Sequence, residues 1–143
     1  MANEDGSRLR LLANDEKDLA VISSMLQDAI VMVADMVFLQ KEQSFVMAVN
    51  RFRWELPDGE IAGERVNAGL RFACVRGVQF RNINRQVQEG FAAVLSITYD
   101  SGLVLIRFSG DGALRLEVSK LICALHDFDL GWPTIWRPKH PVD

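Results

Sequence analysis

Apolar and polar residues alternate with a period of two in several stretches of the chain, which is typical of β-strands. One stretch near the N-terminus follows helical spacing instead, and its apolar residues form a single stripe: Leu19, Ile22, Leu26, Ala29 and Ile30. Asp15 precedes the stripe as a suitable N-cap, and Asp18 stands where a capping-box partner would. The pattern therefore predicts one amphipathic helix that covers a sheet.

After the helix, residues 36–39 and 45–49 predict a hairpin with a polar link at 41–43. Both alternating sets of side chains in this hairpin are apolar, whereas an antiparallel pair with one wet face has only one apolar set. We therefore expect the hairpin to be covered on both sides, by the helix, by a second sheet or by another copy of the protein. Further strands are predicted at 65–74 and 78–80, with Gly77 marking a bulge.

Residues 92–118 predict a three-stranded meander. If Ser101-Gly102 forms a two-residue turn, apolar residues face each other across the first hairpin: Tyr99 and Val104, Ile97 and Ile106, Leu95 and Phe108. If residues 110–112 form the second turn, the pairs are Phe108 and Leu114, Ile106 and Leu116, Val104 and Val118. This register collects nine apolar residues on one face. Residues 121–125 continue as a strand after a bulge near Ser119-Lys120, or residues 119–127 form a short helix.

These elements predict an α+β domain in which one N-terminal helix packs on a strongly bent, mainly antiparallel sheet of seven or eight strands. A half-open barrel is one form that such a sheet can take. We expect a disordered lead at residues 1–7, a single domain at 8–131 and an extended tail at 132–143. The tail region holds several prolines and two tryptophans, which predicts that it is strapped onto the domain.

The net charge of the chain suggests no particular partner, whereas the distribution of charged residues along it suggests one candidate surface. The formal net charge is −3, so no overall basic field attracts nucleic acid. Five arginines nevertheless lie between Arg65 and Arg85 without an acidic residue among them, and acidic residues gather before them. Either these regions face each other or water, or the arginines form a local anion-binding surface. The N-terminus lacks the features of a signal peptide, and no apolar run could cross a bilayer, so we expect a cytoplasmic location.

Candidate chemistry is sparse. His126 and His140 have no partners at metal-ligand spacing, and no phosphate loop or nucleophile elbow is present. Cys74 and Cys123 fall within predicted apolar strands, where cysteines are typically inert core residues. The sequence therefore predicts no cofactor, no metal site and no catalytic residue, and it leans away from an enzyme.

Two arginine clusters are candidate binding sites. In the first, Arg51 and Arg53 alternate with aromatic residues up to Trp54, a pattern that can bind phosphates or stack on bases. The alternative is that the aromatic residues are core and an arginine pairs with Glu55. The second cluster follows from the meander register, which places Arg107 opposite Arg115.

Like charges directly opposed on a sheet are unfavourable unless something neutralises them. Glu117, one pair further along, is the nearest group that could neutralise Arg107 and Arg115, and an anionic ligand is the alternative.

Several segments resemble an uncharacterised bacterial family, the domain of unknown function 2948. The resembling segments are residues 9–13, 18–23, 26–29, 50–55 and 113–118, followed by Trp132 and Arg137-Pro138. The resemblance spans residues 8 to about 141. It implies a compact, cytoplasmic, stand-alone protein and carries no activity, cofactor or catalytic residue.

Three functions remain open from the sequence. The first is a non-catalytic module that self-associates or docks a protein partner, since the hairpin and the tail carry more apolar surface than one helix can cover. The second is an enzyme or carrier for a small anionic metabolite that uses the arginines. The third is RNA or DNA binding through the segment Arg65–Arg85 and the Arg51-Phe52-Arg53-Trp54 face. Nucleic acid is the least favoured of the three partners, because the net charge of the chain is negative. No membrane partner is expected.

Overall fold

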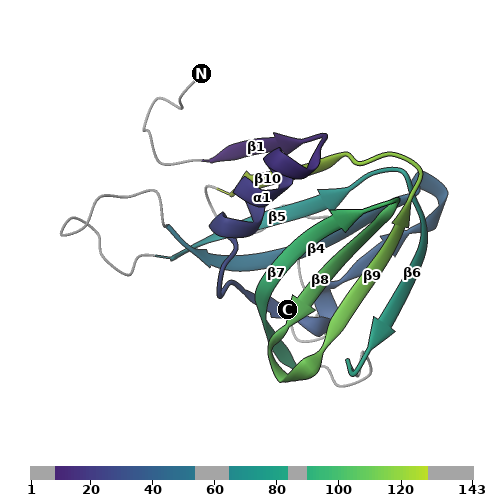
Figure 1. Ribbon diagram of the computed structural model, residues 1–143. Helices are drawn as coiled ribbons and strands as arrows, with labels where there is room; N and C mark the ends of the chain where they lie inside the picture. Colours follow the sequence, from purple (N-terminus) through teal and green to yellow (C-terminus); the bar gives the residue numbers. More distant parts are fainter. Residues whose placement is uncertain (1–8, 54–64, 84–89, 129–143) are drawn as a thin grey trace.

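The computed structural model describes residues 9–53, 65–83 and 90–128 (Figure 1). In chain order its elements are β1 (Arg10–Ala13), α1 (Glu16–Met25), β2 (Ile30–Met32), η1 (Val33–Asp35), β3 (Val37–Leu39), η2 (Gln40–Glu42), β4 (Ser44–Phe52), β5 (Arg65–Phe72), β6 (Val75–Arg81), β7 (Phe91–Asp100), β8 (Leu103–Phe108), η3 (Ser109–Asp111), β9 (Ala113–Val118) and β10 (Cys123–Asp127). The predicted lead at 1–7 and the predicted tail at 132–143 lie outside the described residues.

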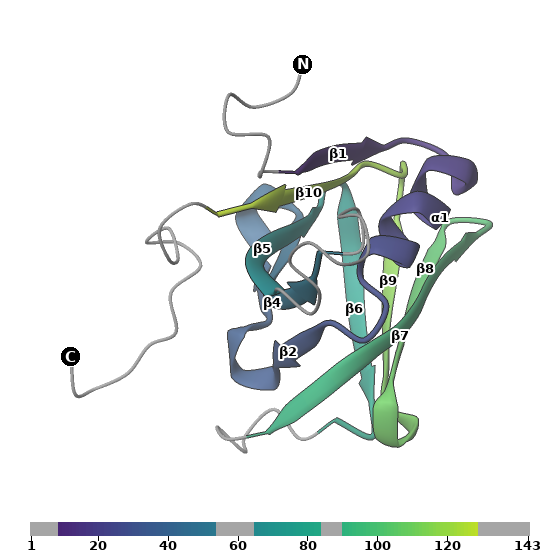
Figure 2. The same ribbon diagram turned by 90° about the vertical axis from the view of Figure 1, so that its left-hand side faces the viewer.

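The strands form one antiparallel sheet in the order β1-β10-β5-β4-β2-β7-β8-β9-β6, with β3 paired to the start of β4. The short strand β2 pairs with β4 on one side and β7 on the other, so it joins two larger portions of the sheet. Figures 1 and 2 show that the sheet bends at this junction, with β6 to β9 on one side and β4, β5 and β10 on the other. The sheet is not closed, because β1 and β6 end the order.

The predicted α+β class, with one helix and a mainly antiparallel sheet, is confirmed. The described residues hold ten strands and not the predicted seven or eight. One reason is that the apolar stripe assigned to the helix continues into β2. Helix α1 ends at Met25, and the chain then turns at Asp28, which adopts a positive φ of 63°. Ile30 therefore lies in a strand and is exposed.

Helix α1 begins as predicted. The Asp15 carboxylate accepts a hydrogen bond of 2.8 Å from the Asp18 backbone N–H, which satisfies one of the unpaired donors of the first turn. The helix contacts β1 and β7. Its side chains Leu19 and Ile22 are buried against the sheet, as is Leu26 directly after it. It therefore covers the gap between two distant parts of the bent sheet, as Figure 2 shows.

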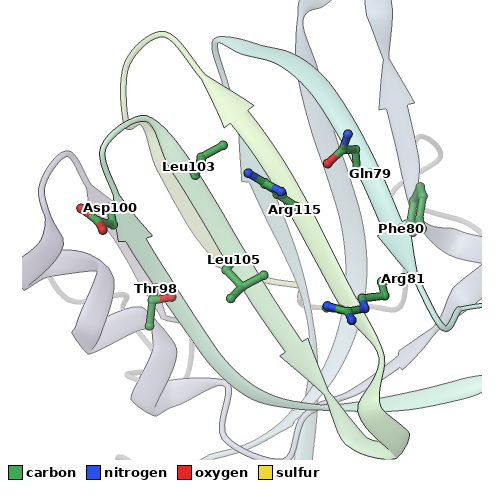
Figure 3. Close-up of a pocket in the computed structure, with 9 residues that line it drawn as sticks. Gln79, Phe80, Arg81, Thr98, Asp100, Leu103, Leu105 and Arg115 are labelled. Atoms are coloured by element: carbon green, nitrogen blue, oxygen red, sulfur yellow. The ribbon is translucent and has the colours of Figure 1, made fainter.

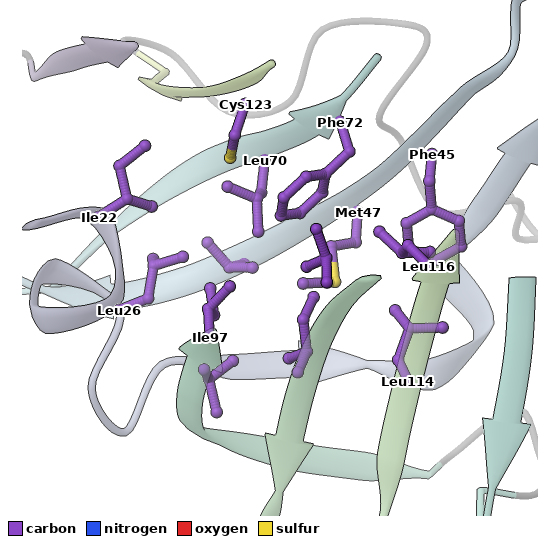
Figure 4. Close-up of a cluster of buried hydrophobic side chains, with 14 of the residues drawn as sticks. Ile22, Leu26, Phe45, Met47, Leu70, Phe72, Ile97, Leu114, Leu116 and Cys123 are labelled. Carbon is purple, nitrogen blue, oxygen red and sulfur yellow. The ribbon is translucent and has the colours of Figure 1, made fainter. Parts of the chain in front are cut away.

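A single core fills the bend of the sheet (Figure 4). Strand β4 crosses the middle of the structure and is buried on both faces, with Phe45, Met47 and Val49 in the core and Val46 and Ala48 on the opposite face. The prediction that this hairpin is covered on both sides is confirmed for β4. The burial is complete within one chain, so a second copy is not needed for it.

The first hairpin of the meander has the predicted register at its turn, with Tyr99 opposite Val104 and Ile97 opposite Ile106. Further along, a register shift between Val94 and Ser96 changes the pairing. Val94 takes the buried position opposite Phe108, and Leu95 is turned outward with 44% of its surface exposed. The prediction that Leu95 faces the core is therefore wrong.

The second hairpin turns one residue earlier than predicted. Gly110 and Asp111 adopt positive φ values of 73° and 63°, and the Phe108 N–H donates to the Gly112 carbonyl at 2.8 Å. Gly112 itself is extended and needed for packing, since a Cβ there would lie 3.1 Å from Ile83 Cγ1. Because the register moves by two residues, the apolar face is unchanged, but the cross-strand partners differ.

The remaining predicted strands also form with small changes. Residues 65–74 divide into β5 and a tight turn in which Cys74 adopts a positive φ of 57°, so this cysteine is not within a strand. The predicted bulge at Gly77 is confirmed by a register shift between Val75 and Gly77. Residues 123–127 are a strand and not a helix, and they pair with β1 and β5.

Candidate functional site

Arg51 lies inside the fold and is held by Asp127. Its Nε donates to Asp127 Oδ1 at 3.0 Å and one terminal nitrogen donates to Oδ2 at 2.7 Å, a two-pronged pair in which both side chains have 0% exposure. A further guanidinium nitrogen donates to the Phe52 carbonyl at 2.9 Å, and Asp127 Oδ2 accepts the Leu9 N–H at 3.0 Å. Arg51 is therefore satisfied by the protein and joins β4 to β10 and the segment that leads into β1.

The other residues of this first cluster do not gather around Arg51. Arg53 is half-buried just beyond β4, and Trp54 lies outside the described residues, as does Glu55. The interpretation of Phe52 as core is wrong, because its side chain is half-buried and the Arg65 guanidinium carbon lies 4.0 Å from the centre of its ring. The side chain of Arg51 points inward from β4, and its burial is tolerated because Asp127 neutralises its charge there.

The arginines that follow along the chain have different surroundings. Arg65 donates to the Asn50 side-chain oxygen and to the Asn50 carbonyl, the latter at 2.8 Å. Arg71 reaches Glu42 at 3.2 Å and the Ser44 hydroxyl at 3.1 Å. Arg76 and Arg81 lie on β6 with exposed side chains, and Arg85 lies outside the described residues. The segment therefore does not present a single arginine surface.

An ordered grid of side chains covers the outer face of β7, β8, β9 and β6, the face turned away from the core. Three rows cross these four strands in register. From β6 to β7 they are Gly77, Glu117, Leu103 and Asp100; then Gln79, Arg115, Leu105 and Thr98; then Arg81, Ala113, Arg107 and Ser96. Arg107 thus faces Ala113, and the predicted pairing of Arg107 with Arg115 is wrong. The two arginines instead lie diagonally on this face, and Arg81 joins them on the other side of Ala113.

Part of this grid lines a hollow of about 920 Å³, which we call the arginine hollow. Figure 3 shows Arg115 near its middle, Gln79 and Arg81 on one side and Thr98 and Asp100 on the other. Leu105 supplies apolar surface beside Arg115. Within the three described stretches of chain, no hydrogen bond or ion pair engages the guanidinium of Arg81 or Arg115.

The predicted neutralisation by Glu117 is not observed. Glu117 is exposed and lies in the row next to that of Arg115. Among the described residues, no ion pair joins Glu117 to Arg107 or to Arg115. The positive charges on the face are therefore available to a ligand. Within the three rows, the acidic residues Glu117 and Asp100 share one row, and the arginines lie in the other two, so the grid has a cationic end and an acidic end.

Comparison with known proteins places the chain in a family. A family model described as "Protein of unknown function (DUF2948)" matches residues 9–140. The chain belongs to this family. The match confirms the resemblance drawn from the sequence and covers every element described above. No curated protein and no solved structure matches the chain.

Two other reactive side chains of this DUF2948 protein, His126 and Cys123, are occupied or buried. His126 Nε2 lies 3.2 Å from Arg10 Nε, which donates to it, and the His126 ring meets Phe128 edge-on. Burial raises the pKa of the Cys123 thiol, which disfavours the reactive thiolate. Among the described residues, no cluster of three histidine, cysteine or acidic side chains could hold a metal ion. None of the helices in the described part of the chain is long and apolar enough to span a membrane.

Sequence reasoning about the DUF2948 chain singled out Arg115 and counted Arg81 among the arginines of residues 65–85, but it did not place Gln79 and Arg81 beside Arg115. Gln79 and Arg81 come from β6, which pairs with β9 although more than 30 residues separate the two strands along the chain. The available signal was the alternation of polar residues at positions 77, 79 and 81. The sequence pattern of β6, which is short and interrupted by the bulge at Gly77, did not indicate that this strand would pair with β9.

Proposed function

We propose that this protein is a non-catalytic binding protein that recognises an anionic group in the arginine hollow. The observation that supports it is the pair Arg81 and Arg115 on one exposed face, with neither guanidinium engaged by any described residue. An arginine presents up to five N–H donors in a planar fork that matches carboxylate and phosphate oxygens. Two such groups beside one hollow favour a ligand that carries negative charge.

The other lining residues define the rest of the ligand. Leu105 and Leu103 are half-buried and give the hollow an apolar floor. Gln79 and Thr98 lie on either side of Arg115 in the same row and can donate or accept hydrogen bonds. A ligand with an anionic group and an apolar body fits this combination better than a bare inorganic ion. The hollow is open to solvent, so we expect modest affinity and marked salt dependence.

Substitution of Arg115 tests this proposal. We expect Arg115→Gln to weaken the binding of an anion by about 10-fold or more, since a charge-assisted hydrogen bond contributes roughly 1.5–3 kcal/mol. Binding would be measured by titrating phosphate, citrate and benzoate against the protein and following amide chemical shifts by NMR. Residues of β6, β8 and β9 should shift together.

Arg76→Gln is the matched control for this experiment. Arg76 is an exposed arginine on β6 that does not line the arginine hollow, so its loss removes the same charge from the protein. The proposal fails if no anion shifts the residues of the hollow, or if Arg76→Gln weakens binding as much as Arg115→Gln does.

Self-association is a second candidate, and a different surface supports it. Ile30 pairs with Ala93 and Met32 pairs with Phe91, so these residues share the outer face of β2 and β7 with the nearby bulged Leu95. Phe91 is 67% exposed and Ile30 39% exposed, and this apolar strip contains no charge. Contiguous exposed apolar surface is typical of protein interfaces.

Sedimentation velocity tests this second candidate. We expect the wild type to form a dimer as its concentration rises and Phe91→Ser to remain a monomer. Leu12→Ser is the matched control, because Leu12 is similarly exposed but lies on β1. A wild type that stays monomeric at every concentration would eliminate self-association through this strip.

A further inference from the structure

The arginine hollow lies beside an edge of the sheet. Strand β6 ends the strand order, and no described strand pairs with its other side. A second hollow of about 450 Å³ runs along the same strand and shares Gln79, Leu103 and Arg115 with the first. Together they form a groove that follows β6 from Gly77 to Arg81, longer than a compact metabolite needs.

We propose that this groove and the adjoining edge of β6 bind an extended acidic peptide segment by strand addition. The inference deepens the proposed function, because it names the ligand that the arginine hollow recognises. An exposed sheet edge offers unpaired backbone N–H and C=O groups, and an added strand can satisfy them while its side chains meet the flanking surface. Regular pairing of β6 with β9 extends over residues 77–81, so about five residues of peptide, or roughly 16 Å, would pair.

The alternation of β6 defines the side chains that such a peptide would carry. On the outer face, β6 presents Gln79 and Arg81, with Arg115 on the next strand. On the inner face it presents Val78 and Phe80, which are half-buried, whereas their partners Leu116 and Leu114 on β9 are fully buried. Since neighbouring strands share faces, the peptide would place acidic side chains on the outer face and apolar ones on the inner face. The expected ligand therefore alternates acidic and apolar residues.

The acidic end of the grid fixes where the negative charge of the peptide belongs. Glu117 lies beside Gly77, and a Cβ on Gly77 would be 3.3 Å from Glu117 Oε1. A carboxylate of the peptide at this end would meet Glu117 and be repelled. The acidic residues therefore belong toward Arg81, and a neutral or basic residue belongs beside Gly77.

The same features favour a peptide over a nucleic acid. A nucleic acid carries a uniform row of phosphates, which Glu117 and Asp100 would oppose at one end of the groove. The middle of the face offers Leu103, Leu105 and Thr98, none of which can stack on a base. Phe80 also lines the hollow, but it is half-buried and lies on the inner face of β6, opposite Leu114. A nucleic acid also has no peptide backbone that could pair with the N–H and C=O groups along the open edge of β6.

The test uses a fluorescein-labelled peptide, Lys-Val-Glu-Val-Glu-Val-Glu, in fluorescence anisotropy with the full chain. We expect saturable binding that Arg81→Gln weakens by about 10-fold or more. Lys17→Gln should leave binding unchanged, because it removes the same charge from an exposed position on α1. Hydrogen exchange read by NMR should show slower exchange of backbone amides within residues 77–81 when the unlabelled peptide is present.

Two altered ligands separate strand addition from simple charge attraction. A peptide N-methylated at alternate residues on the pairing edge should lose most of its affinity, because it cannot donate to β6. A peptide of the same composition with its glutamates adjacent should bind weakly. Equal binding of all three peptides, or tighter binding of a ten-residue oligothymidine, would overturn the inference. If phosphate shifts the Arg115 region but no peptide binds, this inference fails and the proposed function stands, whereas a hollow that binds neither removes both.

Discussion

Replacing Arg51 by alanine is expected to lower the free energy of unfolding by about 3–5 kcal/mol. The change leaves Asp127 buried without its counter-charge, and the carboxylate then retains only the Leu9 N–H among the hydrogen bonds described above. An uncompensated buried charge is costly because the interior solvates it poorly. Asp127→Ala should also destabilise the protein, since it removes both hydrogen bonds that the buried Arg51 guanidinium donates to the Asp127 carboxylate. Urea denaturation followed by circular dichroism measures both changes.

Arg71→Ala is the matched control for Arg51→Ala. Arg71 also forms an ion pair with a carboxylate, but it is 42% exposed and Glu42 is 58% exposed. Water and salt already screen that pair, so its loss should cost only about 0–1 kcal/mol. A double variant with Arg51→Met and Asp127→Leu should be more stable than either alanine variant, because it leaves no buried charge. If Arg51→Ala costs no more than Arg71→Ala, the buried pair does not stabilise the fold.

The second large effect concerns two leucines that the sequence pattern treats alike. Leu116→Ala should lower the free energy of unfolding by about 2–5 kcal/mol, because Leu116 is fully buried in the core and its loss creates a cavity. Leu95→Ala should cost less than about 1 kcal/mol, because the bulge in β7 exposes 44% of its side chain. Thermal and urea unfolding of the two variants provide the comparison.

The contrast between these two leucines tests the bulge itself. Had Leu95 occupied the core position opposite Phe108, both substitutions would destabilise the protein to a similar extent. Val94→Ala extends the test, because Val94 occupies that position and is fully buried. A larger loss of stability for Leu95→Ala than for Val94→Ala would contradict the register described here.

Much of the fold could be predicted where local pattern determines structure. The cap at Asp15 and the apolar stripe from Leu19 to Leu26 define α1, since both are local consequences of helical geometry. The Ser101-Gly102 turn likewise defines the register of the first hairpin near its turn. The even shift in the second hairpin shows why face assignments are more robust than pair assignments. Alternation preserves the buried side, while turn geometry decides which residues pair.

The contacts of the arginines were less predictable because they join distant segments of the chain. Arg51 and Asp127 are 76 positions apart, and strand alternation alone could not distinguish an inward arginine from an exposed one. A buried arginine requires a carboxylate at one particular place, and only the pairing of β10 with β5 supplies it. Arg81 and Arg115 meet on one face for a similar reason, since β6 joins β9 across the chain.

The position of β10 between β1 and β5 has a consequence for biosynthesis. The ribosome makes β1, β4 and β5 before β10. The position between β1 and β5 in the sheet therefore stays unfilled while β6 to β9 are made. During that interval Arg51 lacks its carboxylate, and the edges of β1 and β5 lack their shared partner. The nascent chain therefore carries exposed strand edges until β10 has been made, and chaperones protect such edges against aggregation. Completion of the native sheet is expected to follow the release of the segment around Asp127 from the exit tunnel.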